Sequence, residues 1–208
     1  MPLIRRTPDG VQPDRPDAGE ALATLTHGTR QKRWAAARAL SDAPDAAEAL
    51  GRALSSEDDP HVREAILTSL LRLRSAASIQ AILPHLRSDN ASLRTGALDA
   101  LRAMPDVAGP HLPELLRDAD PDVRLLACDL ARSLRVADAT HLLYGLLEVE
   151  REANICAAAL DVLAEIGGPE ALPVLARCAE RFHDHPFLAF SIKVVTERLS
   201  AQTPRHRG

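Results

Sequence analysis

Apolar positions recur with helical periodicity in a series of segments, each centred on one repeated position that we call the anchor. The anchors are Arg33, Arg63, Arg94, Arg124, Cys156 and Leu188. In most of these segments the residues one before, three after and seven after the anchor are apolar, as Val62, Ile66 and Leu70 illustrate. These offsets fall on one face of an α-helix. The pattern therefore predicts six amphipathic helices, which we call the anchored helices.

Successive anchors are separated by 30 to 32 residues, and a shorter apolar segment precedes each anchored helix. These shorter segments lie at 17–25, 45–54, 78–86, 111–116, 139–149 and 169–182. Each repeat therefore reads as a pair of helices, and a period of this length and regularity is typical of a solenoid. The predicted fold is an all-α, right-handed α-solenoid of about six helix pairs over residues 17–199, with the anchored helices on the inside.

Asp-Pro dipeptides mark the start of two anchored helices, at Asp59-Pro60 and Asp120-Pro121. Proline suits the first turn of a helix, where a backbone N–H has no helical partner. The preceding Asp can cap the free N–H groups and complements the helix dipole. Other prolines interrupt three of the first helices and are expected to bend them. These are Pro84, Pro113 and Pro173.

Composition narrows the class of protein. Hydrophobic residues make up 46% of the 208 residues but aromatic residues only 2%, so the core must be built from small and branched aliphatic side chains. This favours close-packed helices over sheets. The net charge of -4 gives no reason to expect binding to polyanions, so nucleic acid is an unlikely partner. The start "MPLIRRTPDG" lacks the apolar core of a signal peptide, and we expect a cytoplasmic protein without a membrane segment.

Candidate chemistry is sparse. The cluster His183-Asp184-His185 could hold a metal ion, but a polar turn between helices is the more common role of such a segment. Cys128 and Cys156 could form a redox pair, although a free Cys is more often a small buried hydrophobe. The three cysteines never form a CxxC motif, and no Ser-His-Asp grouping or phosphate-binding loop stands out. We therefore expect no catalytic, cofactor-binding or metal-binding residue, and a protein that is not an enzyme.

Two groups of residues on the anchored helices are candidates for contact with a partner. Trp34 and Arg38 lie in the first anchored helix, where Trp34 is either an exposed hot spot or packed beneath the N-terminal residues. Five residues after their anchors come Asp99, Asp129 and Asp161, which would form an acidic row suited to a basic partner segment. An Arg stands three residues after each of the first two Asp, so local pairing is the alternative. These arginines are Arg102 and Arg132.

The ends of the chain differ from the repeats. Residues 1–16 contain four prolines and are expected to form an extended, mobile arm, and residues 200–208 a basic tail. The last anchored helix carries Phe187, Phe190 and Ile192 on different sides, so part of this apolar surface should stay exposed. Phe190 and Ile192 are predicted to lie one outside and one inside. The exposed part would bind a partner protein or a second copy of the chain.

The phrases "DADPDVRLLACDLA" and "GGPEALPVLA" resemble HEAT repeats of the short type first recognised in phycobilisome lyase subunits. The resemblance implies that the anchored helices line the concave face and that Asp and Arg side chains bond between neighbouring repeats. The residues carrying that structural role would be Asp59, Arg63, Arg94, Asp120 and Arg124. It also implies a non-catalytic scaffold or adaptor that binds a partner protein through its concave face or its C-terminal end. The alternative is a subunit of a chromophore-lyase or cofactor-handling complex.

Overall fold

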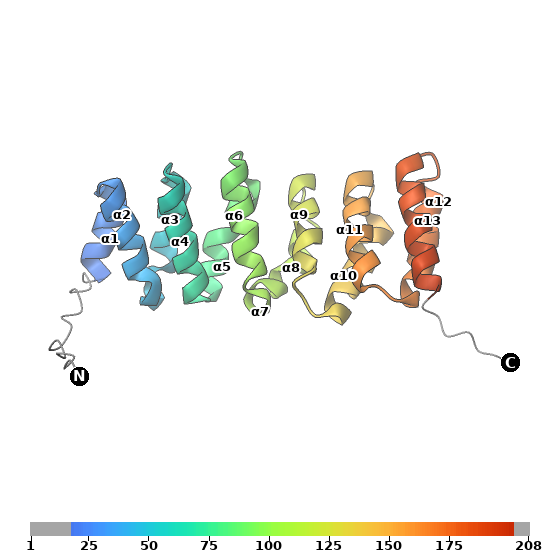
Figure 1. The fold of residues 1–208 in the computed structure, drawn as a ribbon, viewed down its shortest axis with the longest axis horizontal. Helices are drawn as coiled ribbons and strands as arrows, with labels where there is room; N and C mark the ends of the chain where they lie inside the picture. Colours follow the sequence, from blue (N-terminus) through green and yellow to red (C-terminus); the bar gives the residue numbers. More distant parts are fainter. Residues whose placement is uncertain (1–17, 202–208) are drawn as a thin grey trace, which may run out of the picture. The chain divides into compact units, whose positions relative to one another are not determined.

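The computed structural model describes residues 18–201, which form helices and short connecting loops without a strand in that range (Figure 1). The arm predicted at 1–16 lies outside the described residues, as does the tail at 200–208 apart from Ser200 and Ala201. The chain divides into two compact units with the boundary between Ala81 and Ile82, and each unit is described by itself. We call them the N-terminal unit and the C-terminal unit.

The N-terminal unit contains two helix pairs and the start of a third. Its elements are α1 (Ala18–His27), α2 (Arg30–Ala39), η1 (Leu40–Asp42), η2 (Pro44–Ala46), α3 (Ala47–Ser56), α4 (Pro60–Leu73) and α5 (Ala76–Ile82), which ends one residue beyond the unit. Helix α1 packs on α2, α3 packs on α4, and the anchored helices α2 and α4 lie side by side.

The C-terminal unit continues the same arrangement. Its elements are η3 (Leu83–Arg87), α6 (Ala91–Arg102), α7 (Pro105–Ala108), η4 (Gly109–His111), α8 (Leu112–Leu115), α9 (Pro121–Ala131), α10 (Val136–Val149), α11 (Ala153–Ile166), η5 (Pro169–Ala171), α12 (Leu172–Arg181) and α13 (Pro186–Ser200). Each anchored helix packs on the element before it, and α6, α9, α11 and α13 follow one another as neighbours. The predicted all-α solenoid of helix pairs is confirmed.

Apolar side chains of the anchored helices form the core. Val62, Ile66 and Leu70 of α4 are fully buried, and these are the residues one before, three after and seven after the anchor. Burying one such side chain contributes about 1.5–3 kcal/mol. Repetition of this face in most pairs allows a chain with few aromatic residues to build a core within each unit.

Side-chain caps begin the anchored helices as the sequence predicts. Asp59 accepts hydrogen bonds from the N–H groups of His61 (3.0 Å) and Val62 (3.2 Å), and Asp120 accepts one from Asp122 (2.9 Å). Each such cap is worth about 1 kcal/mol.

The three internal prolines interrupt helices, as the sequence predicts. Helix α5 gives way to the 3-10 turn η3 that contains Pro84. Pro113 lies in the first turn of α8 and Pro173 in the first turn of α12, each after a separate 3-10 turn. Proline has no N–H for the preceding turn, so a new helical segment begins at its position. Helix α10, which contains no proline, runs without interruption.

Candidate partner-binding surfaces

The anchor arginines first close the loop before their own helix. Arg63 donates to the backbone carbonyl of Glu57 (2.6 Å), Arg94 to that of Ser88 (2.5 Å) and Arg124 to that of Asp118 (2.9 Å). In each case the acceptor stands six residues before the anchor. A charged donor satisfies a loop carbonyl that has no helical partner, which stabilises the turn into the anchored helix.

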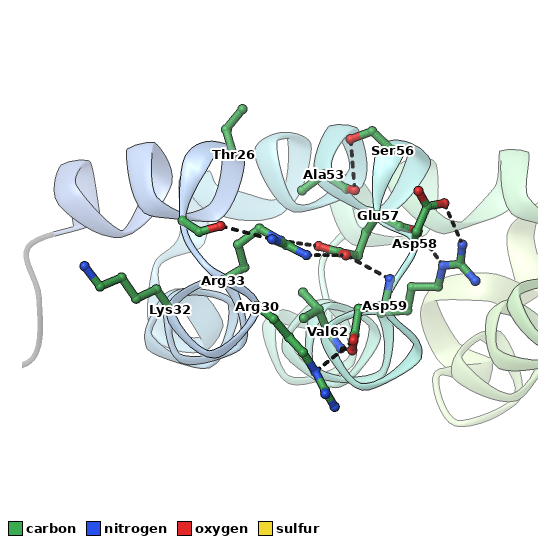
Figure 2. A network of polar contacts seen from close by, with 12 residues as sticks. Thr26, Arg30, Lys32, Arg33, Ala53, Ser56, Glu57, Asp58, Asp59 and Val62 are labelled. Atoms are coloured by element: carbon green, nitrogen blue, oxygen red, sulfur yellow. Dashed lines mark hydrogen bonds and ion pairs between the residues drawn. The ribbon is translucent and has the colours of Figure 1, made fainter.

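Two anchors also bond to the next repeat, each within one unit. In the N-terminal unit, Arg33 forms a bidentate pair with Glu57, at 2.7 Å from Nε and 2.8 Å from Nη2 (Figure 2). In the C-terminal unit, Arg124 pairs with Glu150 in the same manner, at 2.7 and 3.2 Å. Both glutamates are buried. Paired Arg and carboxylate groups of this geometry fix the spacing of neighbouring repeats.

The pKa values of the two glutamates follow from this geometry. The hydrogen bond from Arg33 holds the pKa of Glu57 below its ordinary value, against the effect of burial. Burial alone would raise the pKa of Glu150, but hydrogen bonds from Arg124 and from the N–H groups of Glu152 and Arg151 outweigh it and lower the pKa. Both side chains are therefore carboxylates at neutral pH and suitable partners for the guanidinium groups.

The bidentate bonds that anchor arginines make to the next repeat thus use Glu, whereas Asp59 of an Asp-Pro dipeptide bonds across the repeat boundary to an arginine that is not an anchor. Asp120 caps its own helix. Asp59 does the same and also pairs with Arg30 of α2, in the preceding repeat (2.8 Å). Glu57 and Glu150 are not among the residues predicted from the sequence. The signal that identifies them is an acidic residue six positions before the anchor, which also occurs at Asp118.

The predicted acidic row lies on the C-terminal unit and alternates with arginines. Arg102 bonds to Asp99 (3.1 Å) and to Asp129. Arg132 bonds to Asp129 (3.3 Å), to Asp161 (2.5 Å) and to Glu165. We call this chain of ion pairs the ladder. The local pairing of Asp with Arg that the sequence predicts is present, and it extends across repeat boundaries. A basic partner would therefore have to displace Arg102 and Arg132 before it could bind the three aspartates.

The same face of the N-terminal unit carries a groove. The groove has a volume of about 800 Å³ and runs between α2 and α4, with Trp34 and Arg38 on its α2 side. Trp34 is 39% exposed, so it is a surface residue. The guanidinium of Arg38 lies over the Trp34 ring, 4.7 Å from its centroid.

Helix α13 exposes a row of apolar side chains. Phe187 is 85% exposed, Phe190 68% and Val194 45%. They lie three and four residues apart, which places them on one face of the helix, and we call them the α13 stripe. Ile192 is only 2% exposed, so its assignment to a partner-binding surface is wrong, and it belongs to the core. The prediction that Phe190 and Ile192 lie on opposite sides is confirmed.

The candidate chemical groups are the segment His183-Asp184-His185 and the cysteines. His183 contacts Asp184 (3.1 Å) and the carbonyl of Glu180 (3.0 Å), and among residues 18–201 no group of three or more His, Cys, Asp or Glu side chains is arranged to hold a metal ion. The three cysteines are buried and free. Burial raises the pKa of Cys128 to about 12, so this thiol stays protonated and unreactive at neutral pH.

None of the helices within the described range combines the length and the apolar character that a membrane crossing requires.

Helix pairs stacked at a constant period, with a repeated anchor that closes each turn, define an α-solenoid repeat protein. The family model for HEAT repeats matches residues 19–102 and 109–186. The chain belongs to the HEAT-repeat family.

Solved structures with a similar arrangement include an engineered protein, 16% identical, with 89% of this chain and 97% of that chain covered at a TM-score of 0.42. Another is the complex of CpcE and CpcF of phycocyanin lyase from Nostoc sp. PCC7120, 17% identical, with 95% and 100% covered at a TM-score of 0.42. A search of curated proteins gives no match.

Proposed function

We propose that this protein is a non-catalytic HEAT-repeat scaffold that binds another protein, and that the α13 stripe is a principal contact. The observation that carries the proposal is the exposure of two phenylalanines, Phe187 and Phe190, together with Val194 on one face of one helix. The chain has only three phenylalanines in total. Two of the three phenylalanines therefore lie on the surface and not in the core.

The stripe has the features of a binding hot spot. Large aromatic side chains are enriched at the centres of protein interfaces, where each contributes more than its neighbours. Burying one Phe contributes about 1.5–3 kcal/mol. The stripe spans about two turns of α13, roughly 10 Å, which matches the footprint of an apolar helix or loop of a partner.

Charged residues border the stripe. Lys193 and Glu197 are exposed on the same helix and lie 3.9 Å apart. A polar rim around an apolar centre is the usual organisation of an interface that must also stay soluble when free.

The test begins with affinity purification from the native cell and continues with a purified partner. The double variant Phe187→Ser/Phe190→Ser is compared with Val136→Ser/Val149→Ser, which removes two other exposed apolar side chains of the same unit. We expect the Phe variant to bind the purified partner at least about 100-fold more weakly in calorimetric titration, because the burial of two aromatic side chains at about 1.5–3 kcal/mol each is lost. The Val variant should bind like the wild type.

Equal affinity of the two double variants for every purified partner would contradict the proposal. Sedimentation velocity of the purified chain decides whether the partner is a second copy, since self-association would then disappear in the Phe variant alone. A co-purified complex with a bound bilin would instead favour the role in a chromophore-lyase complex.

A further inference from the structure

Several side chains that line the groove between α2 and α4 are small, among them Ala35, Ala39 and Ala65. The hydroxyl of Ser69 points into the core, where it lies 2.8 Å from the carbonyl of Ala37 and 2.9 Å from that of Ala65. An extended segment could therefore approach the helix backbones closely.

One wall of the groove presents a cation on an aromatic surface. The Arg38 guanidinium lies over the Trp34 ring, 4.7 Å from its centroid, a cation–π contact that favours one position of the guanidinium at the groove. Within the described part of the chain, no carboxylate is paired with Arg38. A guanidinium is well suited to bind a carboxylate through two parallel hydrogen bonds.

The opposite wall adds two donors and one acid. Arg72 is 57% exposed and forms an ion pair with Asp42 at 2.9 Å. His61 receives a hydrogen bond on Nδ1 from Arg30 (3.1 Å), which leaves its Nε2–H as a donor. Glu64 is the one carboxylate that lines the groove.

We propose that this groove binds an acidic segment of a partner protein, in which an Asp or Glu carboxylate pairs with Arg38 and a neighbouring apolar side chain covers Trp34. Charge complementarity supports this occupant, because Arg38 of the groove is a cation without a carboxylate partner in the described part of the chain. The inference concerns another surface than the α13 stripe and does not depend on it.

The charges also argue against a nucleic acid as the occupant. Binding to a phosphate backbone depends on several cations that each neutralise a phosphate. The groove offers two guanidinium groups, of which Arg72 is already paired with Asp42, and Glu64 would repel a phosphate chain.

Trp34 provides a direct measurement because it is the only tryptophan in the sequence. The full chain is titrated with a short synthetic peptide of alternating Glu and Leu, and with a matched peptide of alternating Lys and Leu. Trp34 emission reports on the groove, and the anisotropy of a fluorescein label on the peptide gives the affinity. We expect the acidic peptide to bind and to shift Trp34 emission, with an affinity that falls as salt is added.

The matched variants are Arg38→Gln, in the groove, and Arg52→Gln, an exposed arginine on α3. Loss of a bidentate charged contact should weaken binding of the acidic peptide about 10- to 100-fold in Arg38→Gln and leave Arg52→Gln unchanged. The proposal is overturned if the acidic peptide does not bind, if the Lys peptide or a single-stranded oligonucleotide binds at least as tightly, or if both variants bind equally.

Discussion

The exposed face of the anchored helices is built from the same repeat positions in the two units but carries different surfaces. In the N-terminal unit the position five residues after the anchor is Arg38 or Thr68, and a groove lies between the helices. In the C-terminal unit the same position is Asp99, Asp129 or Asp161 in the first three repeats, where the ladder occupies the face, and Lys193 in the last.

The difference arises from one further position, eight residues after the anchor. Arg102 and Arg132 stand there in the C-terminal unit and reach the aspartate of the next repeat. Ser41 and Leu71 stand there in the N-terminal unit and carry no charge. Residues that pair helices must recur in every repeat, whereas exposed positions can change without loss of the fold. A repeat protein can therefore present different surfaces on a constant frame.

The largest expected effect is a loss of stability when the feature that the two units share, the pair of an anchor arginine with a buried glutamate, is removed. Arg124→Ala and Arg33→Ala should each lower the free energy of unfolding by about 3 kcal/mol, because a buried glutamate loses its partner. The side chains of Glu57 and Glu150 are only 6% and 5% exposed. Chemical denaturation measures the effect. Arg135→Ala, at 88% exposure, is the control and should change stability by less than about 0.5 kcal/mol. Equal midpoints and slopes for Arg124→Ala and Arg135→Ala would rule out the structural role.

A second test compares two helical glycines, one in each unit, for which we expect effects of opposite sign. A Cβ atom added at Gly51 of α3 would lie 2.7 Å from the Cβ of Ala81, so Gly51→Ala should destabilise by about 1–2 kcal/mol. No atom lies within 4 Å of a Cβ added at Gly145 of α10. Gly145→Ala should stabilise by about 0.8 kcal/mol through helix propensity. Thermal melting of both variants checks this, and a shift in the same direction would contradict the packing.

Breaking the ladder should have a smaller effect that depends on salt. Arg132→Gln removes bonds to Asp129, Asp161 and Glu165, but these carboxylates are more than a third exposed, so the expected loss is about 0.5–1 kcal/mol. Arg38→Gln, on the groove side, should change stability by less than about 0.5 kcal/mol. The two variants are compared by denaturation at low and high salt. If Arg132→Gln loses as much stability in high salt as in low salt, the ladder is not an electrostatic element.

The smallest expected effect is a change of stability with pH, which should occur at a different pH in each unit. Burial lowers the pKa of His85, in the C-terminal unit, from its ordinary value of 6.5. The folded state then binds this proton more weakly than the unfolded state, so stability is complete above pH 6.5 and is lost as the pH falls below it. Glu57, in the N-terminal unit, has a pKa lowered from 4.5, so its contribution is lost only at more acidic pH.

Hydrogen exchange between pH 7.5 and pH 5.0 measures this difference. Protection should decline first around η3 and α6, and the variant His85→Gln should remove that decline. His141→Gln, at an exposed position, is the control. Parallel pH profiles for the wild type and His85→Gln would show that His85 is not responsible.

The sequence by itself determined the helix pairs and their core. The period of the anchors, the caps at Asp59 and Asp120, and the buried positions Val62, Ile66 and Leu70 depend on contacts within one helix and its neighbour. Helical periodicity encodes such contacts directly, because residues three and four apart share a face. The prolines were identified from the sequence too, but whether each bends a helix or divides it depends on the turns around it.

Only the tertiary structure decided which side chains meet between helices. Arg124 reaches Glu150 across 26 residues and Arg132 reaches Asp161 across 29, and no periodicity within one helix specifies those partners. The rotation of α13 that buries Ile192 and exposes Phe190 likewise follows from packing on α11 and α12. Partner choice depends on the distance and rotation between neighbouring helices, which side-chain volumes across the whole interface determine together.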